Sequence, residues 1–415
     1  MSIDTDLNIS PYYDDYDENK DYHRVLFRPA VPLQARELTQ LQTILQQQIE
    51  RFGQFQFKEG TIIKGCTFNF DSTIKYVKLF DKTSAGTDVN VSLFGKNDYI
   101  RTAANLVAQI ADSKGGLESQ NPALNTLFFK YINTGTGSQK AYANGDVLEI
   151  YPSATGIANV TITSNGAGYS NSDSVVFASN LRGVGAAGNV VTHANSGDIK
   201  EITITANGAA YSIADYPTVS VTSANASASG FVGSVGLIKT ANVTVANSSF
   251  GLAGNTQFNP VGSAYQMKVE DGLVFQKGSF QRFAAQDIIV SSYTSRPHEL
   301  SVGIVTTEAV VNSSIDTTLL DNASGYSNEN APGADRLRLT PTLTVNTTAV
   351  AEAANNFLQL VKFQNGQKIS MNQEPVLGGM SDELATRTYE ESGDYVVDPF
   401  VISTEELVGN TTHIA

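Results

Sequence analysis

The sequence predicts a mainly β protein with one N-terminal α-helix. We expect a multidomain architecture of β-sandwich or barrel-like units with an inserted two-repeat β module. Three observations lead to this prediction: short alternating apolar segments recur from residue 55 onward, one earlier segment has apolar residues at helical spacing, and one sequence occurs twice in the middle of the chain. The 415 residues are enough for two or three domains, each with its own core.

The first element in the chain is an arm rich in tyrosine and acidic residues, which extends to about Pro32. It has few aliphatic residues to bury, so we expect it to be extended and ordered mainly by contact with another surface. The aromatic and basic residues expected to make that contact are Tyr12, Tyr13, Tyr16, Tyr22, Phe27 and Arg28.

An α-helix is predicted between Pro32 and Gly53, and it completes an N-terminal unit of residues 1–54. Pro32 suits an early helical position and Gly53 suits the position just after a helix. Apolar residues recur between them at spacings of three and four, and these are Leu38, Leu41, Ile44, Leu45, Ile49 and Phe52. One interpretation is that this stripe packs on the protein's own domain. The other is a short helical bundle between subunits, because Leu38, Leu41, Leu45 and Phe52 fit a heptad that is interrupted at Gln48.

Strand patterns occupy residues 55–151 and return in residues 241–415, which we interpret as two parts of one β domain. The segments KEGTIIKGCTF and VEDGLVFQKGSF resemble each other, which suggests that the two parts belong to one structural unit. Cys66 lies in the first of them and is expected to be a small core residue. Short helices are considered for Arg101–Ala111 and within Ala349–Phe363.

Residues 152–240 contain the repeat and are predicted to form the inserted β module. The sequence VTITSNGAGYS at Val160–Ser170 returns as ITITANGAAYS at Ile202–Ser212. Each copy has an alternating strand followed by Asn-Gly, which is typical of a tight turn, and then a tyrosine. We expect two similar halves that provide rigidity or surface display.

Composition excludes several classes of function. The formal net charge is −14 and only 16% of residues are charged. We therefore expect no nucleic-acid partner, because phosphate binding is driven by clustered Lys and Arg. No window has the roughly 20 apolar residues that a membrane span needs. The N-terminal segment is acidic and lacks an apolar core, so we expect no secretory signal. With one cysteine and four scattered histidines, we expect no disulfide and no metal site, in a soluble protein made in a reducing compartment.

Candidate chemical motifs were tested against the structures they require. Gly183–Gly188 matches G-x-G-x-x-G, but the β-branched segment after it has no helical period, so no cofactor is expected. Asp15–Asp21 resembles the start of a calcium loop but has Lys20 where a glycine is needed. Acidic pairs such as Glu270-Asp271, Asp382-Glu383 and Glu390-Glu391 have no partner that would make a glycosidase site. We therefore expect no catalytic, cofactor-binding or metal-binding residues, and no enzyme.

Several long segments resemble, in order, a family of virion structural proteins of contractile-tailed bacteriophages, cyanophages in particular, that is described as a domain of unknown function. The segments are YYDDYDENKDYHRVLFRPAVPLQARELTQLQTILQQQIERFG, FKEGTIIKG, QMKVEDGLVFQKGSFQRF, SYTSRPHELSVGI, LLDNASGYSNENAPGADRLRL and LATRTYEESGDYVVDPF. They cover most of the chain outside about Pro152–Asn255. That gap coincides with the repeated module, as an insertion would.

The resemblance implies a baseplate or tail-fibre-attachment (adaptor) protein in the virion of a myovirus, made in the host cytoplasm. It also implies a homotrimer that contacts other baseplate or tail-fibre proteins. Three alternatives remain open: a receptor- or glycan-binding tail fibre or adhesin that contacts the host surface, a tailspike depolymerase, and a neck or head decoration protein. Related chains extend beyond the last matching segment, so this one is either a short member or the N-terminal part of a longer fibre.

The expected interface combines the arm with the helix. Its residues are Tyr12, Tyr13, Tyr16, Tyr22, Phe27, Arg28, Leu38, Leu41, Leu45 and Phe52. A specific interface needs upward of about 1,000 Å² with aromatic anchors near its centre, and this segment concentrates both tyrosines and leucines.

Overall fold

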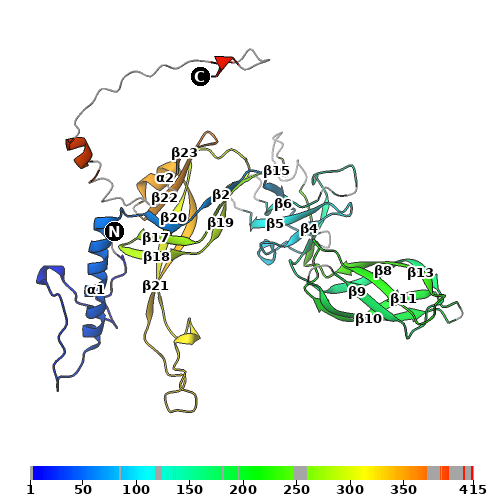
Figure 1. The fold of residues 1–415 in the computed structure, drawn as a ribbon, viewed down its shortest axis with the longest axis horizontal. Coiled ribbons are helices and arrows are strands. Elements are labelled where there is room, and N and C mark those ends of the chain that lie inside the picture. Colours follow the sequence, from blue (N-terminus) through cyan, green and yellow to red (C-terminus); the bar gives the residue numbers. More distant parts are fainter. Residues whose placement is uncertain are drawn as a thin grey trace.

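The computed structural model shows a mainly β protein with an N-terminal helix, as predicted (Figure 1). It describes residues 3–83, 86–116, 124–133, 135, 137–179, 182–194, 196–246, 259–354, 356–371, 384, 386–391, 405–406 and 413–414. Three groups of strands follow one another in space. The first contacts the helix, the second is a seven-stranded sheet, and the third is the repeated module at the end farthest from the helix (Figure 1).

The helix α1 spans Ala35–Gln56, so it begins and ends about three residues later than predicted. Pro32 precedes it, and the Glu37 carboxylate accepts a hydrogen bond from the Gln34 backbone amide at 2.9 Å. Gly53 is inside the helix rather than after it. A Cβ at this position would lie 2.4 Å from the Phe275 ring, so the glycine allows close approach to the β domain and is not a C-cap.

The strands next to α1 form three small sheets around one core. The first sheet has the order β1 (Thr61–Gly65), β17 (Gly272–Gln276), β18 (Ser279–Phe283). The second has the order β19 (Gln286–Ser291), β16 (Tyr265–Val269), β2 (Phe68–Asp71). The third has the order β21 (Arg336–Thr347), β20 (Leu300–Val311), β22 (Phe357–Gln364), β23 (Gln367–Met371).

The pairing of β1 with β17 places strands from before and after the insertion in one sheet. The two segments that resemble each other in sequence pair directly, with Thr61 opposite Phe275. Cys66 is fully buried in the same core, as predicted, and burial raises the pKa of its thiol to about 11. Within Ala349–Phe363 the structure has one short helix, α2 (Thr348–Ala353), which is followed by β22.

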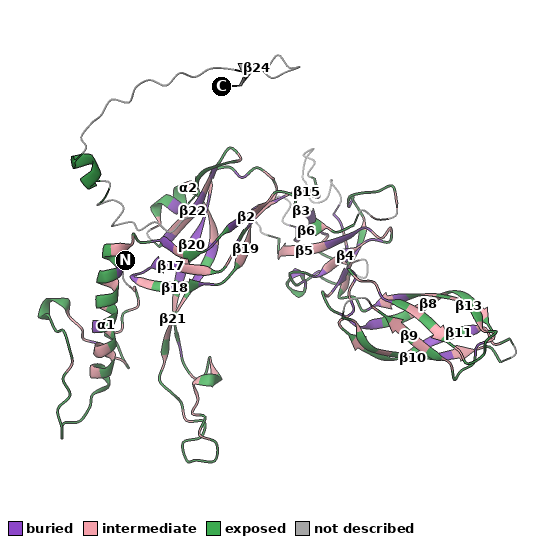
Figure 2. Cartoon of the chain, viewed as in Figure 1, coloured by how far each residue is buried: buried purple, intermediate pink, exposed green. Residues whose placement is uncertain are grey.

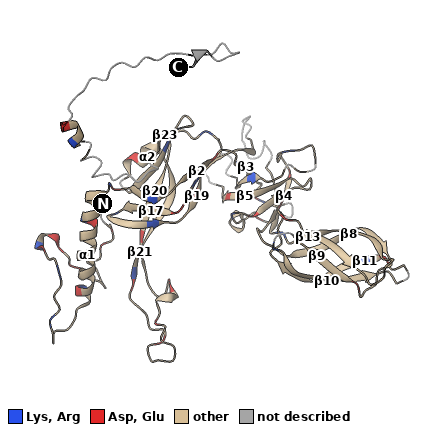
Figure 3. Ribbon diagram, in the orientation of Figure 1, with Lys and Arg blue, Asp and Glu red and all other residues tan. Residues whose placement is uncertain are grey.

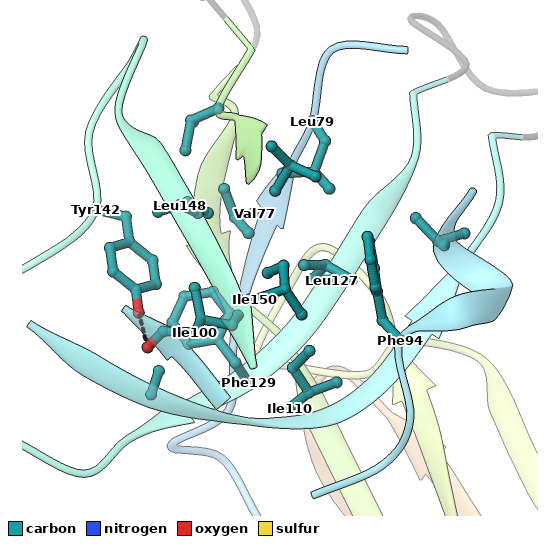
Figure 4. Close-up of a cluster of buried hydrophobic side chains, with 14 of the residues drawn as sticks. Val77, Leu79, Phe94, Ile100, Ile110, Leu127, Phe129, Tyr142, Leu148 and Ile150 are labelled. Atoms are coloured by element: carbon teal, nitrogen blue, oxygen red, sulfur yellow. Dashed lines mark hydrogen bonds between the residues drawn. The ribbon is translucent and has the colours of Figure 1, made fainter. Parts of the chain in front are cut away.

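A seven-stranded antiparallel sheet forms the second group. Its order is β14 (Ala241–Thr244), β7 (Val147–Tyr151), β4 (Tyr99–Arg101), β5 (Val107–Lys114), β6 (Thr126–Tyr131), β3 (Lys75–Lys78), β15 (Val261–Ser263). Figure 4 shows how the sheet curls around its own apolar core. The helix considered for Arg101–Ala111 is wrong. A turn at Thr102–Asn105, where Asn105 has φ 57°, joins β4 to β5 instead, and both strands bury apolar side chains in the sheet.

The repeated module contains six strands, three from each copy. They are β8 (Ile157–Ala167), β9 (Ser174–Ala178), β10 (Val184–Thr192), β11 (Ile199–Ala209), β12 (Thr218–Thr222) and β13 (Ser229–Leu237). The copies exchange partners: β8 pairs with β13 and β11 pairs with β10. Strand β9 pairs with β12 so that Thr218 faces Ala178 and Thr222 faces Ser174. The two halves are therefore related by a pseudo-two-fold axis near Val176 and Ser220.

The Asn-Gly pairs of the repeat are not tight turns, which corrects the prediction. Asn165-Gly166 lies inside β8 and Asn207-Gly208 lies inside β11, with φ of 61° and 67° at the two glycines. A Cβ on Gly208 would lie 2.5 Å from the Ala186 amide nitrogen and 2.9 Å from the Tyr211 ring. The positive φ thus marks an irregularity within a long strand, where the following tyrosine ring folds back onto the backbone.

Two further points complete the fold. Strands β24 (Glu405–Glu406) and β25 (His413–Ile414) pair with each other near the end of the chain. Within the described ranges, the structure contains no helix with the length and apolar character that crossing a bilayer requires.

Candidate subunit interface

Helix α1 is coloured mostly as exposed or intermediate in Figure 2, and it leaves a row of large apolar side chains open to solvent. Between 45% and 76% of each of these side chains is exposed, and they are Leu38, Leu45, Ile49, Phe52 and Phe55. Only Ile44 and Gly53 are buried in the whole helix. An isolated apolar residue on a surface is ordinary, but a contiguous row marks an interaction surface.

The spacing of this row follows the helical period. Leu38, Leu45 and Phe52 are seven residues apart in turn, so they lie within about 40° of one another around the helix axis. Ile49 extends the same face. We call these four residues and Phe55 the α1 stripe. It runs most of the length of the helix and ends beside the β domain.

The N-terminal arm packs along other faces of α1 through polar contacts. The Thr43 hydroxyl donates to the Asp14 carboxylate at 2.5 Å, and Asp14 is buried. Arg36 forms an ion pair with Asp15 at 2.9 Å, and Arg51 pairs with Glu18. The acidic residues of the arm therefore hold it on its own helix. The side chains of the α1 stripe stay exposed, although Leu38 and Leu45 also border pockets that the arm helps to line.

The four tyrosines predicted at the interface have different environments. Tyr12 donates a 2.6 Å hydrogen bond to the Asp335 carboxylate, which fastens the arm beside the start of β21 and raises the pKa of the phenol. Tyr16 is half-buried and lines a cavity of about 260 Å³ between the arm and α1. Tyr13 and Tyr22 are exposed. The structure therefore places Tyr12 in an internal contact and leaves Tyr13 and Tyr22 on the surface.

Leu41, Phe27 and Arg28, which were also predicted at the interface, likewise divide between internal and surface positions. Leu41 is half-buried and lines a small pocket with Ile44 under the part of the arm near His23. Phe27 and Arg28 are exposed and surround a cavity of about 270 Å³ beside Leu38. The structure thus brings Phe27 and Arg28 to the first turn of α1, where they extend the exposed apolar surface.

The base of α1 is held firmly on the β domain. Phe57 follows the helix and packs against Phe275 and Phe280, with ring centroids 6.0 and 5.7 Å apart. Phe275 also lies against Gly53. This aromatic cluster fixes the helix relative to the sheets, so the α1 stripe is presented in a defined orientation.

A buried ion cluster fixes the beginning of the arm. The Lys277 ammonium lies 2.5 Å from Glu308 and 2.6 Å from Asp4, and the side chains of Lys277 and Glu308 are more than nine-tenths buried. Burial opposes ionisation of Glu308. Hydrogen bonds from Lys277, the Thr5 hydroxyl and the Asp4 and Thr5 amides outweigh it and lower the Glu308 pKa to about 2.

Sequence reasoning placed Ile49 on the helix but not at the interface, and it left Phe55 out. Phe55 follows Phe52 at a spacing of three, which was the available signal. Gly53 was interpreted as a helix end, so the stripe was cut short before Phe55. The ion cluster of Lys277, Glu308 and Asp4 joins residues that are distant in sequence, so no local sequence pattern predicts it.

The other sequence motifs lie in strands, turns and loops. Gly183–Gly188 leads into and occupies the start of β10, and Asp15–Asp21 belongs to the arm around the short 3-10 helix η1 (Glu18–Lys20). Glu270-Asp271 forms the turn between β16 and β17. Asp382-Glu383 lies outside the described residues, whereas Glu390 and Glu391 are exposed at the end of a helical stretch over residues 386–391. Where the structure is described, no three His, Cys, Asp or Glu side chains are grouped as metal ligands would be.

Comparison with known proteins gives one finding. A family described as a domain of unknown function, DUF4815, matches residues 10–83 and 258–414, which is more than half of the chain. The unmatched interval includes β4 to β14, so it contains the repeated module and also most of the seven-stranded sheet. No curated protein and no solved structure matches the chain.

Proposed function

The chain belongs to the DUF4815 family, and we propose that it is a structural component of a contractile phage tail, a baseplate or tail-fibre-attachment protein that assembles through the α1 stripe. The observation that carries this proposal is the exposure of Leu38, Leu45, Ile49, Phe52 and Phe55 on one rigidly mounted helix. Burying a side chain of this size is worth about 1.5 to 3 kcal/mol, so a surface of five favours association.

The proposed occupant of the stripe is the α1 helix of two further copies of this chain. The heptad spacing of Leu38, Leu45 and Phe52 is the pattern by which identical parallel helices pack together. The centre of α1 is uncharged, since its charged residues are Arg36, Glu37, Glu50 and Arg51 near the two ends. No like charges would therefore meet where the stripes come together. The number of three copies is proposed from the family resemblance, since this spacing alone does not distinguish a dimer from a trimer.

The place in the virion is proposed from the family resemblance of the long N-terminal and C-terminal segments. In this arrangement the helix, with the exposed Tyr13, Tyr22, Phe27 and Arg28 of the arm, contacts neighbouring tail proteins. The module lies at the opposite end of the molecule and projects away from that attachment (Figure 1). The protein is proposed to act by these contacts, with no bond made or broken on it.

Incorporation into virions tests the proposal. A double variant, Leu45→Lys with Phe52→Lys, places charges in the α1 stripe and should be absent from purified particles of a phage that carries this chain. The matched control is Gln46→Lys with Gln54→Lys, which adds the same charge at exposed positions outside the stripe and should be incorporated normally. Normal incorporation of the stripe variant would contradict the proposal.

A receptor-binding adhesin is the second candidate function. A specific observation favours it: the pocket that lies where the module meets the seven-stranded sheet.

A further inference from the structure

We propose that the pocket between the module and the seven-stranded sheet binds a short saccharide. The pocket has a volume of about 500 Å³, within the range of small-molecule sites. Its walls come from β4 and β7 on one side and from β8 and β13 on the other. All of them belong to one chain, so this inference is independent of the proposed trimer.

Charged and hydroxyl groups converge on this pocket. The Arg101 guanidinium lies over the Tyr216 ring, 4.9 Å from its centroid, and donates a 3.3 Å hydrogen bond to the Tyr216 hydroxyl. Glu149 accepts hydrogen bonds from the Tyr151 hydroxyl at 2.7 Å and from Lys239 at 3.1 Å. These side chains hold one another in place, so the polar lining is preorganised before any ligand arrives.

The lining favours a polyhydroxylated ligand over an apolar one. Carboxylate, guanidinium, ammonium and amide groups offer both donors and acceptors to sugar hydroxyls, while the partly exposed Tyr216 ring offers apolar surface to the carbon face of a sugar. Two cations, Arg101 and Lys239, face one carboxylate, Glu149, so the pocket carries a local positive charge on a chain of net charge −14. An acidic sugar is therefore expected to bind more tightly than a neutral one.

The two halves of the module differ at this pocket. Between the tyrosine of each repeat and the next strand, the second copy has two additional residues, and Tyr216-Pro217 accounts for them. Tyr216 lines the pocket, so the additional residues supply one of its aromatic walls.

A second difference concerns the strand pair that borders the pocket. Asn159 on β8 faces Gly236 on β13, whereas the equivalent pair in the other half is Glu201 on β11 and Val191 on β10. A Cβ on Gly236 would lie 2.1 Å from the Asn159 side-chain oxygen. The glycine therefore gives the Asn159 amide room to lie along the pocket wall, which the valine of the other half would not.

Binding by the full-length protein tests this proposal. The probes are neutral and uronic-acid-containing oligosaccharides of two to six units, measured by isothermal titration calorimetry and by saturation-transfer NMR. Lys239→Ala and Asn159→Ala each remove an exposed polar group from the pocket and should weaken binding at least tenfold. Tyr216→Phe keeps the ring and removes the hydroxyl, and should weaken it severalfold. The matched controls are Lys200→Ala and Glu201→Gln on the equivalent strand of the other half.

The proposal requires binding of at least one probe, with the controls unchanged and the acidic members bound more tightly than neutral ones of equal length. It is overturned if no probe binds at millimolar concentration, or if the pocket variants and the controls bind alike. A thermal melt of each variant separates loss of binding from loss of folding. Particle incorporation does not depend on the pocket, so failure here leaves the assembly proposal standing.

Discussion

Helix α1 and the repeated module differ in how far their apolar residues are covered within the chain. In the module, β8 pairs with β13 and β11 with β10, so each copy of the repeat covers the other, and the ribbon over these strands is almost free of charge (Figure 3). In α1, the arm covers the faces around Thr43 and Ile44, while the α1 stripe faces solvent. The module completes its strand pairing within one chain, with Val176, Val184 and Val232 as the large exposed apolar residues of its strands, whereas α1 carries five larger exposed apolar side chains on a single helix.

The two parts of the molecule therefore differ in whether they need a partner surface. A unit that satisfies its strands internally can project from a particle without a partner. A helix with five large exposed apolar residues gains free energy only when another surface covers them. The following predictions test this contrast from the largest expected effect to the smallest.

The largest effect is expected from charging the helix. Leu45→Lys with Phe52→Lys should reduce the association constant of the subunits by more than a thousandfold, because each lysine would be desolvated in the interface. The monomer should stay folded, since both positions are exposed. Analytical ultracentrifugation gives the association constant, and circular dichroism with thermal melting checks the fold. If this variant and the Gln46→Lys, Gln54→Lys control had similar association constants, the α1 stripe would not be the surface that joins the subunits.

In the module, Gly208→Ala should destabilise the fold by about 3 kcal/mol or more. Its Cβ would meet the Ala186 amide nitrogen at 2.5 Å and the Val184 carbonyl at 2.6 Å, and φ is positive. Gly185→Ala is the control, because it also has positive φ but has its nearest neighbour at 3.9 Å, and it should cost about 1 kcal/mol. Urea denaturation measures both free energies of unfolding. If both variants lost the same free energy of unfolding, close packing around Gly208 would contribute nothing to stability.

How far the sequence predicts these two regions depends on how local the signals are. The repeat and the helical stripe are local patterns, and both led to the correct kind of element. The Asn-Gly pairs were misassigned because a turn and an irregular strand share the same dipeptide, and only pairing with a distant strand distinguishes them. Gly53 was misassigned for the same reason, since its role depends on Phe275, more than two hundred residues away.

The sequence predicted part of the exposed apolar face of α1. Leu38, Leu45 and Phe52 come from spacing, and they share one exposed face of α1. Tyr12 was expected to contact a partner, but its hydroxyl hydrogen-bonds to Asp335 within the same chain. Residue type indicates that an aromatic side chain will make a contact. It does not indicate whether the contact is internal or with another subunit.

The ion cluster at the start of the arm should make stability depend on pH. Glu308 has a folded pKa of about 2 against 4.5 for an ordinary Glu, so its ionised form stabilises the fold above about pH 5. That contribution is lost as the pH falls from 4.5 toward 2. Glu308→Gln should therefore cost about 2 kcal/mol at pH 7 and much less near pH 3, as measured by urea denaturation. A loss that does not change with pH would show that the charge has no role.

The smallest effect is expected from the exposed ion pair on the arm. Asp15→Asn removes the partner of Arg36, but both side chains are more than 40% exposed, so the loss should be at most about 0.5 kcal/mol. Hydrogen exchange of the α1 amides should be almost unchanged. A large increase in exchange would mean that this pair, and not the buried Asp14, holds the arm on the helix.

The most direct test of the contrast between helix and module is the mass of the full-length protein in solution, measured by light scattering at micromolar concentration. We predict three times the chain mass of 44.3 kDa for the wild-type protein, and the mass of one chain for the Leu45→Lys, Phe52→Lys variant. A wild-type protein that remains a monomer up to tens of micromolar would contradict the account, since the α1 stripe would then be exposed without joining subunits.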